Sequence, residues 1–136
     1  MPRGASHCLP CCCWRPAPAG RWTYTLYGIA LGEYYLATRD PWVVKELEEI
    51  NQWLVNAQHP ATAAPERVHM AGGFGHNPHM PSGNGYGSFN VVTAQAMIAW
   101  ALMERAGLSV DRTRVTAAHE FIAKGTNAPH RFGSTG

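Results

Sequence analysis

Two copies of one helix pattern, about seventy residues apart, constrain the fold of this chain more than any other feature. Each copy has a helix that is apolar on most faces, a short turn, and an amphipathic helix that begins at an aspartate, Asp40 in the first copy and Asp111 in the second. Helices of these two kinds bury a continuous apolar layer when hairpins stack side by side. The pattern therefore predicts an all-α domain built of tandem αα-hairpins.

The first hairpin is predicted to run from Trp22 to Ala57. Its first helix, residues 22–38, is apolar nearly all round, which predicts burial on most of its faces. Gly28 and Gly32 lie one turn apart on one side of this helix and are expected to permit close contact with another helix. The second helix is expected to start at Asp40-Pro41, with an N-cap carboxylate and a proline at the first helical position. Its apolar stripe comprises Val43, Leu47, Ile50 and Leu54.

The second hairpin repeats this order. Residues 90–104 are again apolar on most sides, and Gly107 is a natural helix stop. Asp111 is expected to cap the amphipathic helix that follows, and Gly125 to end it. The residues expected to point inward are Val115, Ala118, Phe121 and Ile122.

A long glycine-rich loop, residues 58–87, separates the two hairpins. It contains Gly72-Gly73-Phe74-Gly75-His76 and, further on, Asn84-Gly85-Tyr86-Gly87. Glycines at this density let the backbone turn tightly and approach a neighbour closely, while the aromatic residues fill the space left by the missing side chains. We expect this stretch to serve chiefly as a structural joint between the hairpins.

The two ends of the chain are expected to lie outside the folded domain, which we place at residues 22–127. Residues 1–21 are predicted to form a disordered leader because prolines and glycines interrupt any regular element. This leader holds all four cysteines, and Cys8-x-x-Cys11 has the spacing of metal ligands. A distant histidine would have to complete such a site, and a bridge to another chain or lipidation are alternatives. Residues 128–136 are predicted to form a flexible tail.

The charge of the chain argues against two classes of partner. A formal net charge of +2, with 15% charged residues, is too small to favour nucleic acid or an anionic membrane surface. No apolar run reaches the length of about 18 residues expected of a transmembrane helix. The sequence gives no signal for a cofactor and none for a particular compartment.

The loop and its flanking helices resemble the α/α-toroid superfamily, which includes terpenoid cyclases and protein prenyltransferase β subunits. The resemblance rests on Gln58, on Gly72-Gly73-Phe74-Gly75, and on Thr93-Ala94 in the next helix. A closer similarity is to an uncharacterised bacterial domain family of that fold, through the motifs at residues 31–40, 72–76 and 84–95. The resemblance covers about Trp22 to Asn127, and it implies that the tandem hairpins form part of an α/α toroid.

Two departures from the superfamily change what the resemblance implies. A full toroid has ten or more helices, whereas four fit here, so we expect a fragment of a ring or an assembling subunit. The expected partners are the missing toroid hairpins or further copies of the chain. The metal site of the prenyltransferases, built from Asp, Cys and His, has no counterpart, and the acidic DxDD motif of the cyclases is absent.

A few residues are candidates for chemistry. Glu33 is a carboxylate on a helix expected to be mostly buried, and His76 belongs to the glycine-rich motif, so both are acid/base candidates. His76 and His79 are spaced as a pair of metal ligands, although no nearby carboxylate completes a site. The aromatic residues that could bind a ligand are Tyr35, Phe74, Tyr86 and Trp100. Each of these residues also has a structural interpretation, as a core side chain or a satisfied hydrogen-bonding group.

Two functions remain in view. The first is a toroid repeat segment with a structural or binding role. The second is part of a toroid enzyme that acts on a glycan or an isoprenoid in a central cavity. A single carboxylate on an inner helix is a poor basis for a glycosidase, which generally needs two.

Overall fold

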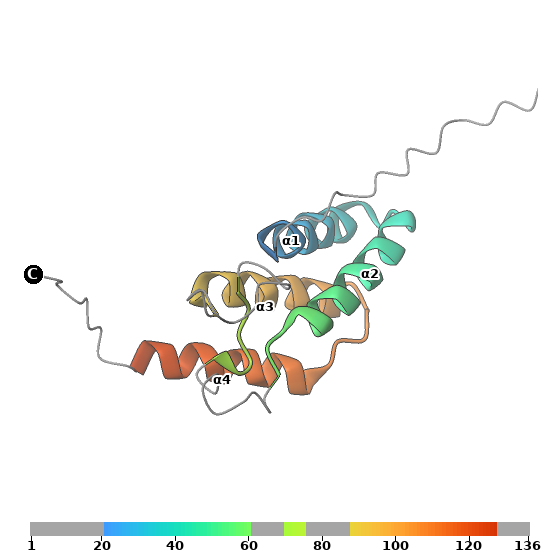
Figure 1. Cartoon of the computed structure of the whole chain (residues 1–136). Coiled ribbons are helices and arrows are strands. Elements are labelled where there is room, and N and C mark those ends of the chain that lie inside the picture. The colour runs from blue at the N-terminus through green and yellow to red at the C-terminus, as the bar shows by residue number, and fades with distance from the viewer. Residues whose placement is uncertain (1–20, 61–69, 76–87, 128–136) are drawn as a thin grey trace, which may run out of the picture.

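The computed structural model describes residues 21–60, 70–75 and 88–127. These ranges contain four helices and no strand. The helices are α1 (Arg21–Thr38), α2 (Trp42–Ala57), α3 (Asn90–Arg105) and α4 (Arg112–Asn127) (Figure 1). The all-α prediction is confirmed, and the helices lie within one or two residues of the predicted boundaries.

The helices form two hairpins packed against each other. α1 packs on α2 and α3 packs on α4, and the two hairpins meet mainly where α1 contacts α3. In Figure 1, α1 and α3 run in the same direction, and α4 runs back along α3. α3 contacts all three other helices and is therefore the centre of the fold.

Two glycines of α1 bring it close to α3, as expected from their spacing. A Cβ atom at Gly28 would lie 2.9 Å from the Cβ of Ala99, and one at Gly32 would lie 2.8 Å from the Cβ of Leu102. Real Cβ atoms essentially never approach so closely, so α1 and α3 are in contact through the backbone of α1.

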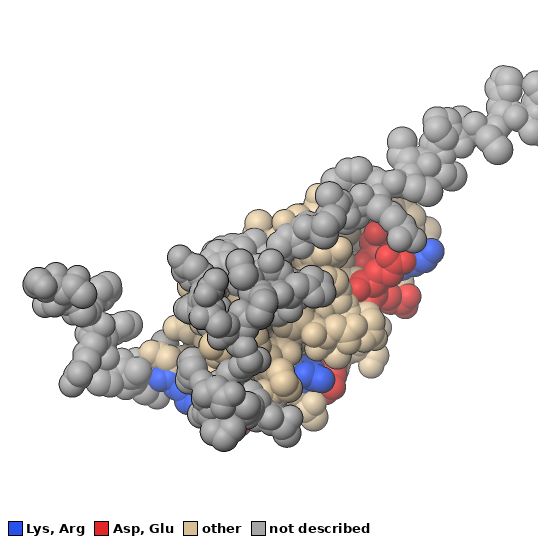
Figure 2. Space-filling model, viewed as in Figure 1, with Lys and Arg blue, Asp and Glu red and all other residues tan. Residues whose placement is uncertain are grey.

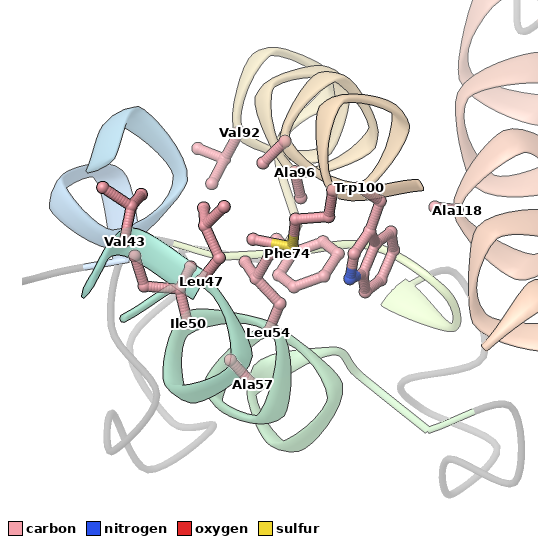
Figure 3. Packing of buried hydrophobic residues seen from close by; sticks show 12 residues of the cluster. Val43, Leu47, Ile50, Leu54, Ala57, Phe74, Val92, Ala96, Trp100 and Ala118 are labelled. Atoms are coloured by element: carbon pink, nitrogen blue, oxygen red, sulfur yellow. The ribbon is translucent and has the colours of Figure 1, made fainter. Parts of the chain in front are cut away.

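The core lies between α2 and α3 (Figure 3). The predicted stripe of α2 is confirmed, because Val43, Leu47, Ile50 and Leu54 are all buried. α3 contributes Val92, Ala96 and Trp100, α4 contributes Ala118, and Phe74 enters from the glycine-rich loop. Of the residues predicted to point inward from α4, Ala118 is fully buried and the other three are half-buried.

The prediction that the first helix of each hairpin is buried on most faces is wrong. Leu26 of α1 is 51% exposed, and Val91 and Ile98 of α3 are 50% and 51% exposed. α1 is covered by α2 and α3 on one side only, and α3 likewise keeps one free face. An apolar sequence reports that a helix can be buried, but it does not report whether a neighbour is present to bury it.

The two aspartates that begin the amphipathic helices differ. Asp111 caps α4 as predicted, accepting a hydrogen bond from the Thr113 backbone N–H at 2.9 Å. Asp40 does not cap α2, which begins at Trp42 with Pro41 in the N-cap position and no side-chain cap. The Asp40 carboxylate instead accepts a long hydrogen bond, 3.5 Å, from the Tyr34 hydroxyl.

The two glycines expected to end helices also differ. Gly107 follows α3 with φ of 92°, and the N–H groups of Gly107 and Leu108 bond to the carbonyls of Glu104 and Met103. This is the Schellman geometry of a glycine stop. Gly125 does not end α4, which continues to Asn127. A Cβ atom at Gly125 would lie 3.0 Å from the Asn90 side chain. Gly125 therefore allows α4 to approach the start of α3 closely.

Some predictions fall outside the described residues. They are residues 1–20 of the predicted leader with its cysteines, the flexible tail, and the parts of the glycine-rich loop that hold His76, His79 and Tyr86, whereas Arg21 belongs to α1. These remain predictions.

Candidate functional site

The described part of the glycine-rich loop, residues 70–75, is fastened to both hairpins through its backbone. Gly72 donates a hydrogen bond to the His59 carbonyl at 2.9 Å, and the His59 N–H donates to the Gly73 carbonyl at 3.0 Å. One step further, the Phe89 N–H donates to the Phe74 carbonyl at 2.8 Å. The segment therefore joins the end of α2 to the start of α3.

Gln58 holds this joint with its side chain. The Nε2 group donates to the carbonyls of Gly72 and of Arg114, each at 2.8 Å, and the residue is only 4% exposed. One amide thus connects the end of α2, the loop and the first turn of α4. Its Oε1 atom is buried and accepts no hydrogen bond in the part of the chain that the structure describes.

The glycines of the joint are required by close contacts. Gly72 has φ of 83°, a conformation that side chains disfavour, and a Cβ there would overlap the Ala117 carbonyl of α4. A Cβ at Gly73 would lie 2.5 Å from the Cβ of Ser88 and 2.9 Å from the Phe121 ring. Both glycines therefore face α4, and Gly73 also faces Ser88, so the segment packs between α4 and the residues that lead into α3.

Phe74 and Trp100, two of the predicted binding residues, lie in the core. Their rings meet edge to face with centroids 5.6 Å apart, and they are 0% and 1% exposed. The Phe74 N–H donates to the Thr93 hydroxyl at 3.0 Å, and the Trp100 Nε1–H donates to Asn51 Oδ1 at 3.0 Å. Both residues therefore pack the fold. Ligand binding by them stays a prediction, and it would require the core to open.

The other two site candidates within the described residues are on α1. Glu33 is exposed, so the expectation of a carboxylate on a mostly buried helix is wrong: α1 leaves this face uncovered. Tyr35 is half-buried, and the Arg39 guanidinium lies 5.5 Å from the centre of its ring. A cation at this distance is attracted to the ring face.

The histidine candidates His76 and His79, together with Tyr86, lie outside the described residues. Among the residues that the structure does describe, no three His, Cys, Asp or Glu side chains are grouped so that they could hold a metal ion. Within the same ranges, no helix has both the length and the apolar character needed to cross a membrane.

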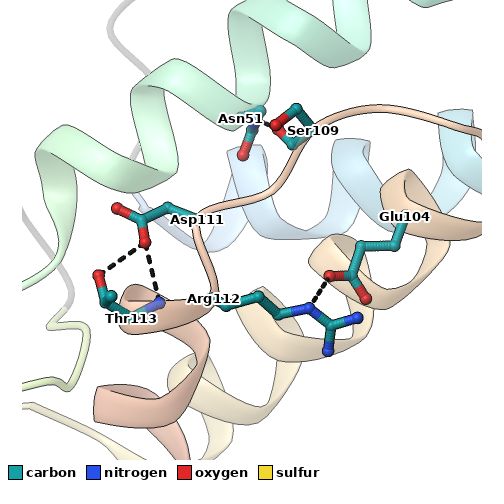
Figure 4. A network of polar contacts seen from close by, with 6 residues as sticks. All are labelled: Asn51, Glu104, Ser109, Asp111, Arg112 and Thr113. Atoms are coloured by element: carbon teal, nitrogen blue, oxygen red, sulfur yellow. Dashed lines mark hydrogen bonds and ion pairs between the residues drawn. The ribbon is translucent and has the colours of Figure 1, made fainter.

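A polar network connects the second hairpin to α2 (Figure 4). Asn51 accepts a hydrogen bond from the Trp100 indole N–H and donates through Nδ2 to the Ser109 carbonyl at 3.0 Å.

Two further polar contacts lie within the second hairpin. Thr113 donates its hydroxyl to Asp111 Oδ1 at 2.6 Å, and the hydrogen bonds from the Thr113 hydroxyl and backbone N–H lower the pKa of Asp111. Arg112 closes the turn from α3 to α4 by pairing with Glu104 at 2.8 Å.

The sequence did not single out Asn51 as important. Its position supplies one signal in retrospect, because Asn51 follows the buried Ile50 in the α2 stripe and so lies next to the core rather than opposite it. Gln58 was identified only as one of the residues that resemble the α/α-toroid superfamily, and its hydrogen bonds were not predicted. A polar residue directly after the last apolar residue of a helix, and before a glycine-rich loop, is placed to satisfy free backbone carbonyls.

The fold and its joint define an all-α domain of two helical hairpins. The sequence model of one protein family, described as "Domain of unknown function (DUF6288)", matches residues 15–127 of the 136-residue chain. The chain belongs to this family, so the expected membership of an uncharacterised domain family is confirmed. A search of curated proteins and a search of solved structures each gave no significant match.

Proposed function

We propose that this chain is a repeat segment of the α/α-toroid type, similar to the hairpins of terpenoid cyclases and prenyltransferase β subunits. In this proposal its role is structural: it packs against, and so binds, further helical hairpins. The glycine-rich joint fixes the geometry between its own two hairpins. The neighbours are the missing hairpins of a ring or other copies of the chain.

The observation that carries the proposal is the exposed apolar surface on α1 and α3. Leu26 and Gly28 are two residues apart, and hence about 200° apart around α1, so Leu26 points away from α3. Val91 and Ile98 are seven residues apart on α3 and share a face, on the opposite side from the buried Ala96. Each of these three apolar side chains is about half exposed. These exposed apolar side chains, on two separate faces of the paired helices, are where we expect neighbouring hairpins to pack.

Sedimentation velocity over a wide range of protein concentrations tests the proposal. We expect the wild-type chain to associate, and a Leu26→Glu, Ile98→Glu double variant to stay monomeric with an unchanged helical circular dichroism spectrum. Thr116→Glu, on the exposed face of α4, is the matched control and should associate like the wild type. A wild-type chain that remains monomeric at every concentration and binds no hydrophobic dye contradicts the proposal.

The alternative is an enzyme of the toroid type acting on a glycan or an isoprenoid. One observation favours it: Glu33 is exposed and lies seven residues after Leu26, on the same face of α1. A carboxylate on a face lined by neighbouring hairpins could act on a ligand enclosed there. Glu33→Gln in the assembled protein tests this alternative, which requires turnover of an oligosaccharide or polyprenyl substrate to be lost while assembly is unchanged.

A further inference from the structure

The turn between α1 and α2 carries two large aromatic side chains that the fold leaves uncovered. Trp42 is 55% exposed and Tyr34 is 43% exposed. Their ring centroids are 6.3 Å apart and their planes are tilted by 47°. A Tyr and a Trp at this distance form a pair, and their remaining ring surface faces solvent. We name Tyr34, Arg39, Asp40 and Trp42 the aromatic corner.

Two polar side chains of the same turn, Asp40 and Arg39, have unused hydrogen-bonding capacity. The Asp40 carboxylate does not cap α2, and it accepts a hydrogen bond from the Tyr34 hydroxyl at 3.5 Å. Arg39 is exposed, and its guanidinium is held over the Tyr35 ring. The corner therefore offers a carboxylate acceptor next to Tyr34, and a guanidinium donor in the same turn, over the Tyr35 ring.

The backbone at this corner is unusual. Arg39 has φ of 58°, and among the described residues it is the one non-glycine with a positive φ. Its N–H donates to the Tyr35 carbonyl at 2.8 Å, which is the left-handed stop of a helix, a position where glycine is the usual residue. A residue kept in a disfavoured conformation motivates a search for a role of its side chain.

The surrounding charge argues against an anionic ligand. α2, which begins at the corner, carries three exposed glutamates, Glu46, Glu48 and Glu49, against one exposed lysine, Lys45, and in Figure 2 a cluster of acidic side chains lies over this helix beside a smaller basic area. Such a field repels phosphates, nucleic acid and anionic lipid headgroups. The corner therefore suits a neutral ligand that has both apolar and hydroxyl faces.

We propose that the aromatic corner binds a neutral oligosaccharide. The C–H faces of a sugar ring pack on exposed aromatic rings, and adjacent hydroxyls can donate to the Asp40 carboxylate and accept from the Arg39 guanidinium. The sugar lies on the surface of the hairpin and needs no central cavity. This site goes beyond the packing role, because it uses none of Leu26, Val91 and Ile98.

Titration of the full chain with three neutral oligosaccharides (cellohexaose, maltohexaose and N-acetylchitohexaose) tests the proposal. Calorimetry should give a dissociation constant of roughly millimolar order for at least one of them. The indole N–H signal of Trp42, assigned in the nuclear magnetic resonance spectrum by its loss in Trp42→Phe, should shift on binding. Hexagalacturonate, an anionic oligosaccharide, should bind more weakly.

Two variants and one control make the test specific. Trp42→Ala should weaken binding by about tenfold or more. Arg39→Gly should also weaken it, while its unfolding midpoint stays the same or rises, because glycine accepts the backbone conformation. His119→Ala, which removes an exposed ring on α4, should bind like the wild type. The proposal is overturned if no neutral oligosaccharide binds the wild-type chain, or if Trp42→Ala binds as tightly as the wild type. Association in sedimentation is a separate readout, so this site and the packing role can fail independently.

Discussion

Gly28 of α1 lies against Ala99 of α3 so closely that a methyl group on Gly28 would meet the Ala99 Cβ at 2.9 Å. The same substituent would lie 3.3 Å from Ile50 of α2 and from Met103 of α3. A single residue without a side chain thus lies where α1, α2 and α3 meet. Glycine costs a helix about 1 kcal/mol in propensity relative to alanine, so its presence here reflects packing between hairpins.

Gly28→Leu should therefore destabilise the domain. The added side chain must displace α3 or α2, and overpacking of this kind costs about 1–3 kcal/mol. Chemical denaturation followed by circular dichroism measures the change. Ala30→Leu, on the exposed face of the same helix, should stay within about 0.5 kcal/mol of the wild type. Equal stabilities of the two variants would show that the close contact between α1 and α3 is not important for folding.

Much of this packing could be predicted from the sequence. The spacing of Gly28 and Gly32 indicated a close helix contact, and the stripe of α2 indicated its buried face. Both signals are local, because they depend on helical period alone. The exposure of Leu26 and Ile98 could not be predicted in this way. Whether an apolar face is covered depends on elements elsewhere in the fold, and the residues of the face itself do not specify them.

Gly72→Ala should cost more than Gly107→Ala, although both glycines have a positive φ. At Gly107, φ is 92° and no atom lies within 4 Å of a built Cβ, so alanine should cost only the backbone strain, about 1 kcal/mol. At Gly72 the Cβ also overlaps the Ala117 carbonyl, which cannot move without shifting α4. We expect at least about 1 kcal/mol of additional loss for Gly72→Ala. Chemical denaturation of both variants separates the cost of backbone strain from the cost of the contact with α4. Equal losses of unfolding free energy would contradict the close packing of Gly72 against Ala117.

Gln58→Glu should destabilise the joint strongly. The substitution keeps the shape of the side chain but replaces a donor of two hydrogen bonds by a carboxylate that faces the Gly72 and Arg114 carbonyls. Loss of both bonds in a buried place costs roughly 3 kcal/mol. Gln52→Glu, the same change on the exposed side of α2, is the control and should have little effect. A small effect at Gln58 would indicate that the amide does not connect α2, the loop and α4 in solution.

The roles of Asp40 and Asp111 show where the sequence was not sufficient. Both precede an amphipathic helix, and the same capping role was predicted for both. Pro41 takes the N-cap position of α2, so Asp40 lies one residue too far from the helix, next to Tyr34. Asp111 is followed directly by α4, with Thr113 in place to donate. One residue of register separates the cap at Asp111 from Asp40, whose carboxylate accepts from the Tyr34 hydroxyl instead, and sequence patterns place helix boundaries only to within a few residues.

The cap of α4 should depend on pH through Asp111. Its pKa is lowered from 3.8, first by the hydrogen bond from the Thr113 hydroxyl and then by the bond from the Thr113 backbone N–H. Because the folded pKa lies below the unfolded one, the stabilisation by Asp111 is fully present above about pH 4. It is lost as the pH falls through the lower, folded pKa. Thr113→Val removes the largest cause, so the pKa of Asp111, followed by nuclear magnetic resonance of its carboxyl carbon between pH 6 and pH 2, should rise toward its ordinary value. Thr116→Val, on the exposed side of the same helix, is the control and should leave the Asp111 titration unchanged. A titration midpoint that is the same in Thr113→Val and in the wild type would contradict the hydroxyl bond as the cause and leave the backbone N–H as the cap.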